Sequence, residues 1–328
     1  MVHGIVMFSG GLDSVIATHL LKSQGLQIKA LHFVLPFYSG LGNSYKEVRR
    51  YADGLGIPLR VEEEGEEFLK MILDPHFGYG KNANPCMDCR IERLKKARKI
   101  MEEEGASFIA TGEVIGQRPM SQRMECLHRV EKKADLQGFL LRPLSAKLLA
   151  PTRVEMEGLV DRERLLGITG RSRKVQLEYA RNNGLAHSTP AGGCLLTHAD
   201  PARRFNELVS IKQKIHLNDF KLLAWGRHFR VAPQCKVVVS RNESENNILE
   251  KIAATEDHFM YLAEIPGPVA VVRGDCAAEQ IRVAASIMVR FSKARNMGKV
   301  KVKVYHKGDM LMEEVESASE QFCESMRI

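Results

Sequence analysis

The sequence predicts an α/β fold, in which a doubly wound, mostly parallel sheet is followed by a smaller α+β domain. Short apolar segments alternate with helical patterns over about the first 145 residues, as in parallel βαβ units. Beyond residue 235 the pattern changes to strands separated by polar turns and two helical runs. Polar, glycine-containing motifs follow the strands of the first part, where ligands bind in such sheets.

The elements of the first part are predicted from the spacing of apolar residues. Strands are expected at residues 4–8, 27–35, 59–62, 107–111 and 138–142. Helices are expected at residues 12–23, 45–55, 66–73, 91–104, 155–166, 172–183 and 201–213. The long, charged stretch 112–137 is predicted to be a loop. Parallel strands end at one edge, so residues 9–14, 32–37 and 111–117 should converge on one crevice.

The second part has its own elements and boundaries. Strands are expected at residues 236–240, 259–263, 269–273 and 299–306, helices at 247–255 and 278–291, and a polar turn at 242–247. Changes in composition predict domain boundaries near 186 and 233. The predicted order is a first domain over residues 1–186, a linker segment over 187–233 that carries Cys194, a second domain over 234–308, and an acidic tail over 309–328 that forms a solvated helix face.

Charge and cysteine content narrow the class of protein. The formal net charge of +8 over 328 residues favours a polyanionic partner. No signal peptide opens the chain, and no apolar run is long enough to span a bilayer. We therefore expect a cytoplasmic protein with no membrane partner, in which disulfides rarely persist. Clustered cysteines among the seven then favour metal binding or chemistry, whereas Cys235 and Cys276 are expected to be buried filler.

A glycine turn, Ser9-Gly10-Gly11-Leu12-Asp13-Ser14, lies between the first predicted strand and helix. The helix start offers unpaired N–H groups and a positive dipole end, and the glycines let a phosphate come close. It is not a Walker A loop, because G-x-x-x-x-G-K-[ST] does not occur. The order resembles the pyrophosphate loop (PP-loop) of the N-type ATP pyrophosphatases. That resemblance implies a Rossmann-like, adenine-nucleotide alpha-hydrolase-like fold and cleavage of ATP between its α and β phosphates.

The residues expected to bind ATP are those of the loop together with residues at the ends of later strands: Ser9, Gly10, Gly11, Asp13, Ser14, His32, Gly112 and Gln117. Asp13 is expected to contact Mg²⁺ and to take part in catalysis. The alternative for Asp13 is an acidic residue that only satisfies the helix dipole.

Cys86 and Cys89 form a C-x-x-C pair just ahead of a predicted helix, where backbone N–H groups favour the thiolate. Half of a zinc site would have the same spacing, but the chain has no second C-x-x-C. The order Asn-Pro-Cys-x-x-Cys with the distant Gly-Cys at Cys194 resembles the tRNA 2-thiouridylases. Residues 111–122 instead resemble the tRNA 4-thiouridine synthetases, with one extra residue before Ser121.

These resemblances imply a tRNA sulfurtransferase that adenylates a pyrimidine carbonyl oxygen, expected to be that of uridine, and replaces it with sulfur. They imply that Cys86, Cys89 and Cys194 are catalytic and bind three irons of a [4Fe–4S] cluster, which leaves the fourth iron open. The alternative is a persulfide on Cys194, attacked by Cys86 or Cys89. The sulfur donor would be sulfide or a cysteine desulfurase. The oligomeric state stays open and includes a homodimer.

A basic strand lies near the end of the chain. Lys299, Lys301 and Lys303 alternate with valines, and Lys293 and Arg295 precede them. The segment 234–308 resembles the RNA-binding domain of the NFACT-type ribosome quality-control proteins, which implies that these five residues bind RNA, here tRNA. An edge strand that carries lysines against aggregation is the alternative. Few aromatic residues accompany the lysines, so we expect backbone and shape recognition rather than base stacking.

Two other functions stay open. One is a PP-loop enzyme that amidates or ligates a small molecule, with ammonia in place of sulfide. The other is a non-catalytic RNA-binding adaptor that keeps a nucleotide pocket. The cysteine trio and the basic domain disfavour the first, and the intact loop at residues 9–14 disfavours the second.

Overall fold

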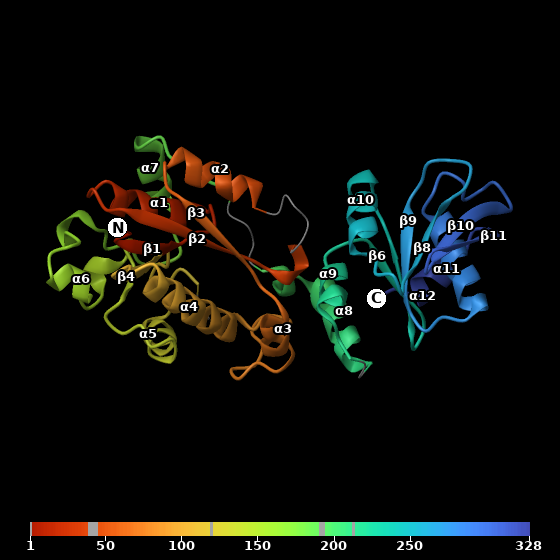
Figure 1. Cartoon of the computed structure of the whole chain (residues 1–328), viewed down its shortest axis with the longest axis horizontal. Coiled ribbons are helices and arrows are strands. Elements are labelled where there is room, and N and C mark those ends of the chain that lie inside the picture. The colour runs from red at the N-terminus through yellow and green to blue at the C-terminus, as the bar shows by residue number, and fades with distance from the viewer. Residues whose placement is uncertain (1, 39–44, 119–120, 190–193, 212–213) are drawn as a thin grey trace. The chain divides into compact units, whose positions relative to one another are not determined.

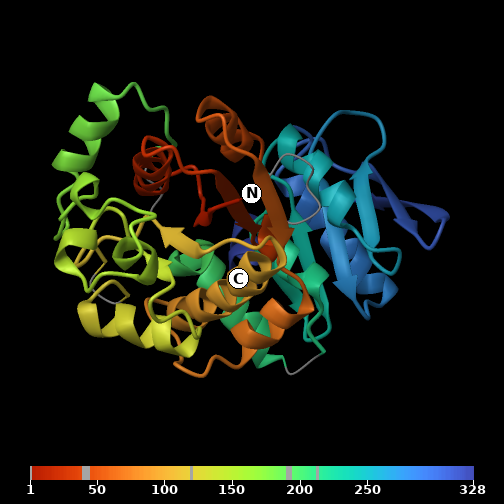
Figure 2. The same cartoon turned by 60° about the vertical axis from the view of Figure 1, so that its left-hand side comes forward.

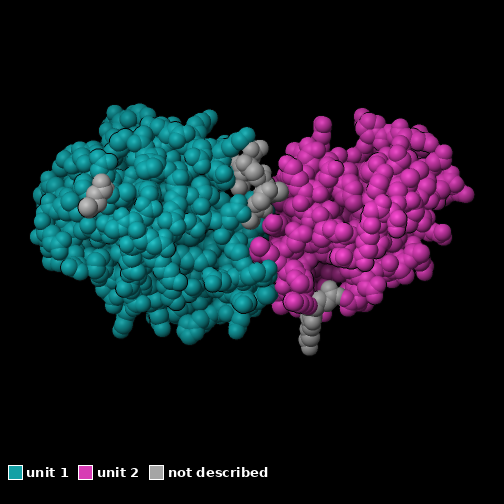
Figure 3. Space-filling model, viewed as in Figure 1, with its two compact units in different colours: residues 1–193 teal, residues 194–328 magenta. Residues whose placement is uncertain are grey.

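The computed structural model describes residues 2–38, 45–118, 121–189, 194–211 and 214–328. The chain divides into two compact units, Met1–Gly193 and Cys194–Ile328 (Figure 3). Each unit has its own sheet and its own buried core. Among the described residues, no helix has the length and apolar character that crossing a membrane requires.

Unit 1 is built on a five-stranded parallel sheet in the order β3-β2-β1-β4-β5. The strands are β1 (Gly4–Met7), β2 (Ile28–Val34), β3 (Leu59–Glu63), β4 (Phe108–Thr111) and β5 (Leu140–Leu141). All five lie within the predicted segments, apart from the one-residue extension of β3. The predicted doubly wound sheet is confirmed, and its strand order reverses between β1 and β4.

Helices cover both faces of this sheet (Figures 1 and 2). On one face, α1 (Leu12–Lys22) and α7 (Lys174–Asn182) pack against a core that includes Val6 and Ala110. On the other face, α4 (Cys86–Glu103) and α5 (Met124–Lys133) pack against Ile5 and Ile109. Successive strand residues thus bury opposite faces, as the pleat of a strand requires. The remaining helices of four or more residues described in unit 1 are α2 (Lys46–Gly54), α3 (Glu66–Leu73) and α6 (Arg153–Met156).

Three elements of unit 1 differ from the prediction. The helix expected from residue 91 begins at Cys86, so the cysteine pair lies in its first turn. The expected loop 112–137 contains α5, which buries Leu127 and Val130 and is therefore held by packing. The helix expected over 155–166 is only the short α6 followed by a 3₁₀ turn, because a capping box at Thr152 starts α6 early and Gly158 adopts a positive φ just after it.

Unit 2 is an antiparallel six-stranded sheet in the order β11-β10-β8-β9-β7-β6 with helices packed on it. Its strands are β6 (Arg227–Ala232), β7 (Cys235–Val239), β8 (His258–Leu262), β9 (Val269–Gly274), β10 (Val300–His306) and β11 (Asp309–Val315). Its helices are α8 (Ala199–Ser210), α9 (Leu217–Leu222), α10 (Glu243–Ile252), α11 (Ala278–Arg290) and α12 (Glu320–Ser325). The long helix α11 buries Ala284 and Met288 against inward-facing Met260 and Val302.

Unit 2 also differs from the sequence-based expectation. Residues 309–328 form β11 and α12, not a solvated tail. Strand β6 lies before the expected boundary at 233 and joins the sheet, and the division between the units falls at 193/194 rather than near 186. Cys235 and Cys276 were expected as separate filler, but they form a disulfide between the start of β7 and the segment after β9. Helix α10 begins at Glu243, inside the expected turn, because Asn242 caps it.

Candidate functional site

The glycine turn and the motif after β4 meet at the point where the strand order of unit 1 reverses. Residues 9–14 follow β1 and residues 111–117 follow β4, and these two strands are neighbours. The side-chain amide of Gln117 donates a hydrogen bond of 2.8 Å to Oδ2 of Asp13. The predicted convergence of these two segments is therefore confirmed. A ligand of a doubly wound sheet binds at this position.

The turn leaves the start of α1 open. Gly10 has φ +72°, a conformation that favours glycine, and a Cβ there would lie 2.8 Å from the Tyr51 ring. Gly11 is the N-cap residue of α1, and no side chain caps the helix. The Ser14 hydroxyl instead donates to the Gly11 carbonyl at 2.9 Å and shapes the turn. An uncapped helix start behind two glycines is a site for an anion such as a phosphate.

Gly112 is a glycine because two backbones approach each other closely. A Cβ at Gly112 would lie 2.6 Å from the Asp13 carbonyl carbon and from the Ser14 nitrogen. Residue 112 therefore packs on the turn, and its absent side chain is what lets β4 and the turn meet. This close packing requires glycine at position 112, in addition to the predicted role of Gly112 in ATP binding.

One carboxylate oxygen of Asp13 has a hydrogen-bond partner, and the other has none among the described residues. Its Oδ2 accepts from Gln117, whose side-chain oxygen accepts from the amide of the fully buried Gln176 on α7 at 3.3 Å. Its Oδ1 is buried without a hydrogen-bond partner among the described residues. A buried carboxylate oxygen without a donor is costly unless a cation or proton meets it. This oxygen fits the expected Mg²⁺, which typically binds one or two carboxylates together with phosphate oxygens.

Two further residues lie at this edge: His32, which was predicted there, and Ser188, which was not. Nδ1 of His32 on β2 lies 2.9 Å from the Phe8 carbonyl oxygen, next to the turn. Burial lowers the pKa of His32, more than the Phe8 contact raises it. The Ser188 N–H donates to the Gly10 carbonyl at 2.9 Å, so the segment after α7 runs beside the turn. Gln176 and Ser188 carry no sequence signal of their own, because only the fold brings them here.

The cysteine pair lies at the same edge of the sheet. Cys86 and Cys89 are three residues apart in the first turn of α4, so both point from one side of the helix. Both are partly exposed. Asp88 between them accepts backbone N–H bonds from His76 and Phe77, each at 3.1 Å, and thereby fixes the preceding loop on the helix start.

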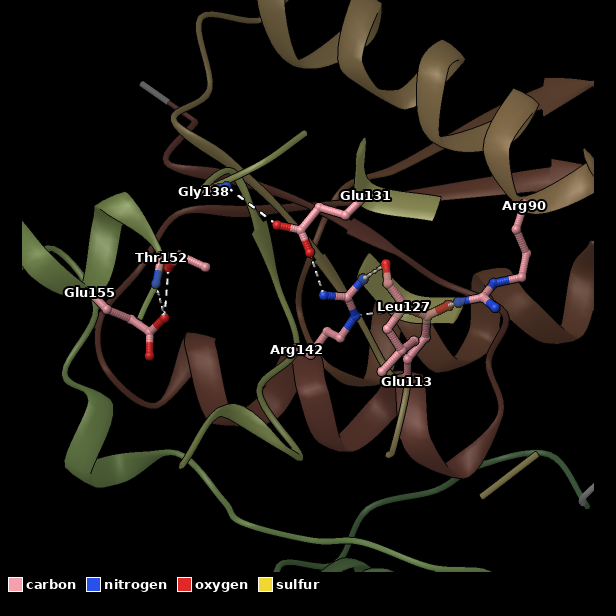
Figure 4. Close-up of polar contacts among 8 residues, drawn as sticks. All are labelled: Arg90, Glu113, Leu127, Glu131, Gly138, Arg142, Thr152 and Glu155. Atoms are coloured by element: carbon pink, nitrogen blue, oxygen red, sulfur yellow. Dashed lines mark hydrogen bonds and ion pairs between the residues drawn. The ribbon is translucent and has the colours of Figure 1, made fainter. Parts of the chain in front are cut away.

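An ion network joins the cysteine turn to the motif after β4 (Figure 4). Arg90, next to Cys89, contacts Glu113, and Glu113 also accepts from Arg142 at 3.0 Å. Arg142 reaches Glu131 of α5 at 2.9 Å. Burial would raise the pKa of Glu113, but Arg90 and Arg142 together outweigh it and hold that pKa below its ordinary value. The start of α4 is thus locked to the segment that carries Gln117.

The third expected cysteine is in unit 2. Cys194 precedes a 3₁₀ turn over Leu195–Thr197, and the residues just before it lie outside the described part of the chain. Over the described residues, no three His, Cys, Asp or Glu side chains gather as a metal-binding group. The thiol donors at Cys86 and Cys89 fit two corners of an iron–sulfur site, so the cluster stays a proposal.

A cavity of about 320 Å³ lies beside β5 and α5, outside the predicted site. Its charged lining residues include Glu131, Arg142 and Glu155. Each is already paired. Glu131 and Arg142 bind each other, and Glu155 binds Thr152 (Figure 4). Glu155 also pairs with Arg162. None of its lining residues belongs to the glycine turn or to the cysteine pair.

The basic residues of unit 2 are distributed over β10 and the segment before it. Lys293, Arg295 and Lys299 are exposed and make no ion pair with another described residue. Lys301 pairs with Glu264 at 3.0 Å, which raises the pKa of Lys301. Lys303 lies over the ring of Tyr261, 5.7 Å from its centroid. The alternation predicted for this strand is confirmed, with Val302 and Val304 buried.

The structure combines an α/β domain, in which an uncapped helix start lies where the strand order reverses, with an α+β domain that has basic residues on one strand. Each of the two domains is similar to a known protein family. Residues 3–160 match the family described as "tRNA methyl transferase HUP domain", and residues 226–325 match "NFACT protein RNA binding domain". The resemblance of residues 234–308 to an NFACT-type RNA-binding domain is confirmed. The resemblance of residues 111–122 to the 4-thiouridine synthetases stays a prediction.

Curated relatives are similar over the first part of the chain. The "tRNA-specific 2-thiouridylase MnmA" of Syntrophotalea carbinolica is 33% identical over 119 residues, which are 34% of this chain and 34% of the relative. The protein of the same name from Sulfurimonas denitrificans is 35% identical over 116 residues, 33% of each chain. The chain thus spans about a third of the length of these relatives.

Solved structures show a weaker likeness. The "predicted subunit of tRNA methyltransferase" from Methanocaldococcus jannaschii has 18% identity and a TM-score of 0.35, covering 56% of this chain and 76% of that one. "U34-tRNA thiolase NcsA from Methanococcus maripaludis with its [4Fe-4S] cluster" has 16% identity and a TM-score of 0.35, covering 64% and 65%.

Proposed function

We propose that this protein is an ATP-dependent tRNA sulfurtransferase that adenylates a pyrimidine carbonyl oxygen, that of uridine, and replaces it with sulfur. The observation that carries the proposal is the placement of Cys86 and Cys89 at the same sheet edge as the uncapped start of α1. Arg90 binds Glu113, and Gln117 of the same segment bonds to Asp13 of α1. The RNA-binding family match of residues 226–325 supports an RNA substrate. Such an enzyme works where its tRNA is, in the cytoplasm.

The chemistry requires a leaving group, because oxide leaves a pyrimidine ring poorly. Transfer of AMP to the carbonyl oxygen makes that oxygen part of a good leaving group. Negative charge grows on pyrophosphate in this step, and the N–H groups at the start of α1 are oriented to stabilise it. Oδ1 of Asp13 would hold Mg²⁺ against the phosphates, while Gln117 fixes Oδ2.

Sulfur delivery is assigned to Cys86, Cys89 and Cys194. When bound by three cysteines, a [4Fe–4S] cluster supplies an iron with an open position for inorganic sulfur. The persulfide alternative uses the same residues, with Cys194 as the carrier. The sulfur donor and the oligomeric state stay predictions.

The function is tested by incubating the full chain with tRNA, ATP and labelled sulfide under anaerobic conditions. The proposal expects ATP-dependent label in the RNA and a thiolated pyrimidine after digestion and mass spectrometry of the nucleosides. Cys86→Ser, Cys89→Ser and Cys194→Ser should each abolish the label. Cys126→Ser, on α5, is the matched control and should retain it. Label that appears without ATP, or none with the intact chain, contradicts the proposal.

The two sulfur chemistries are separated on the same preparation. A cluster predicts about four irons per chain and a broad absorbance at roughly 400 nm, both lost in Cys86→Ser. A persulfide predicts a sulfane-sulfur mass adduct on Cys194 and thiolation by an iron-free sample when the sulfur comes from cysteine and a cysteine desulfurase, because sulfide alone forms no persulfide without an oxidant. Activity that persists after removal of iron overturns the cluster.

A further inference from the structure

The sheet of unit 2 has one face that α11 does not cover. On β8 and β10, residues Met260, Val302 and Val304 turn towards α11 and are buried. Neighbours in sequence turn the other way, since side chains alternate along a strand. The outward set contains three aromatic rings and two lysines, all exposed in full or in part: Phe259, Tyr261, Lys301, Lys303 and Tyr305. This set is not evident in the sequence, because its aromatic residues come from two strands more than forty positions apart.

The register of the strands brings these side chains together. β10 pairs antiparallel with β8 so that Lys303 faces Tyr261 and Tyr305 faces Phe259. Tyr261 and Tyr305 are then diagonal neighbours, with ring centroids 5.5 Å apart and planes within 15° of each other. Their hydroxyls are 2.9 Å apart. The Phe259 ring continues the surface, 6.5 Å from Tyr261. We call the rings of Phe259, Tyr261 and Tyr305 the aromatic platform.

Positive charge lies on the platform itself. The Lys303 ammonium is over the Tyr261 ring, and no described acidic side chain pairs with it. Lys301 is two residues away, about 6.6 Å along the strand, where Glu264 engages it. The exposed Lys293, Arg295 and Lys299 precede this strand. A cation beside stacked rings is suited to a ligand that has both flat π-systems and negative charge.

The strand next to β10 extends the surface with methionines. Met310 faces Tyr305 and Met312 faces Lys303 in the register of β11 with β10. Their side chains are 51% and 46% exposed. Elsewhere the outward side of the sheet is covered, since Val238 of β7 and Val271 of β9 are fully buried although they turn away from α11. The open part is therefore confined to β8, β10 and β11.

We propose that the aromatic platform binds a single-stranded segment of RNA, with bases stacked on Tyr261 and Tyr305 and a phosphate at Lys303. The inference deepens the proposed function and rests on it for the RNA nature of the partner. Planar bases match two near-parallel rings, and the backbone charge matches the unpaired Lys303. Base stacking thus replaces the backbone-only recognition that the few aromatic residues of the sequence had suggested.

A protein partner fits these observations less well. An apolar docking surface has its charged groups at the rim, whereas Lys303 lies over one of the rings. The tyrosine hydroxyls also keep polar atoms on the surface. Association with a protein or with a second copy of the chain is therefore an outcome that the experiment must detect as a contradiction.

The test uses the full chain and a twelve-nucleotide uridine oligonucleotide with one central 2-aminopurine, whose fluorescence is quenched by stacking. The double variant Tyr261→Leu, Tyr305→Leu should lower affinity by on the order of 10-fold to 100-fold and abolish the quench. Tyr305→Phe keeps the ring and should bind and quench as the native chain does. Lys303→Gln should keep the quench, weaken binding, and reduce the slope of log K against log salt by about 0.7.

Phe322→Leu is the matched control, because Phe322 is an exposed aromatic residue on α12 of the same unit and should change nothing. Fluorescence of Trp225, the single tryptophan of the chain, checks that each variant is folded. Failure of the intact chain to bind the oligonucleotide overturns the platform. So does a double variant that binds and quenches normally, or one that changes only the sedimentation coefficient.

The same variants separate the platform from the proposed function. If the intact chain thiolates tRNA and the double variant still binds and quenches the oligonucleotide, the platform fails and the function stands. If the intact chain never thiolates tRNA but stacks the oligonucleotide through the two tyrosines, the proposed function fails and the platform stands.

Discussion

The carboxyl edge of the sheet in unit 1 and the open face of the sheet in unit 2 are organised in opposite ways. At the edge, Asp13, Gln117 and Gln176 are linked by hydrogen bonds, and backbones approach so closely at Gly112 that no side chain fits. On the face, Tyr261 and Lys303 remain partly exposed and contact each other. A site that stabilises charge in a transition state must be preorganised, whereas a surface that holds a flexible strand needs only rings and charges in register.

This difference predicts two kinds of mutational effect. Substitutions at the edge should reduce turnover or unfold unit 1. Substitutions on the face should reduce RNA affinity and leave turnover at saturating RNA unchanged. An edge variant that lowers RNA affinity and leaves turnover unchanged would contradict this distinction between the two regions.

The largest effect is expected from Asp13→Asn. This substitution removes the negative charge of the carboxylate whose Oδ1 has no hydrogen-bond partner among the described residues, and it keeps the shape of the side chain. Adenylation, followed as pyrophosphate release in the presence of RNA, should fall by on the order of 100-fold or more. Asp53→Asn, an exposed aspartate on α2, is the control and should turn over normally. Normal pyrophosphate release by Asp13→Asn would refute the assigned role.

Glu113→Gln should be the most destabilising of these changes. It leaves Arg142, only 2% exposed, with one of its two carboxylate partners lost and Arg90 without its own. Breaking such a buried pair costs about 3–5 kcal/mol, measured as the free energy of unfolding in urea. Glu103→Gln, at an exposed pair with Arg60, should cost about 0.5 kcal/mol or less. Equal costs for the two variants would mean that the network does not hold the edge.

The contribution of Glu113 to the stability of unit 1 should decrease as pH falls. Its pKa is lower in the folded chain than in the unfolded chain, so its contribution to stability is complete above the unfolded value, near 4.5. That contribution is lost as pH falls through the folded value. Urea midpoints for unit 1 should therefore fall below about pH 4.5, and less steeply in Glu113→Gln.

A smaller effect is expected from Gln117→Leu, which removes the donor to Asp13 but leaves the carboxylate in place. Turnover should fall by about 10-fold, because Asp13 loses its fixed orientation. The affinity for the uridine oligonucleotide should not change. A loss of affinity with turnover unchanged would place Gln117 outside the nucleotide site.

The smallest effect is a pH dependence confined to unit 2. Burial, aided by Lys236 and Arg204, lowers the pKa of His228 well below its ordinary value. The unfolded chain therefore takes up a proton first as pH falls below about 6.5, and stability is lost over that range. The carbonyl of Trp225 lies 2.7 Å from Nε2 of His228, so Trp225 fluorescence reports on this region during unfolding in urea. The urea midpoint should decrease as pH falls below about 6.5, and it should depend less on pH in His228→Asn. The same dependence of the urea midpoint on pH in the native chain and in His228→Asn would contradict this assignment.

The features that the sequence predicted correctly are those whose residues are contiguous in the chain. The turn at residues 9–14, the cysteine pair and the alternation of Val302 with Lys303 are each contiguous, and the structure has the expected local form at all three. Helix α5 was missed because it is held by burial of Leu127 and Val130, not by a strong local pattern. Gln176 and the tyrosine pair were missed because partners 59 and 44 residues away define them.

The central claim is that the substrate oxygen itself is adenylated and leaves with AMP. It is tested most directly by placing ¹⁸O in the uridine carbonyl groups of tRNA and analysing the AMP formed during thiolation. The account predicts one ¹⁸O atom in AMP for each sulfur atom gained by the RNA. AMP without ¹⁸O, alongside thiolated RNA, would contradict it.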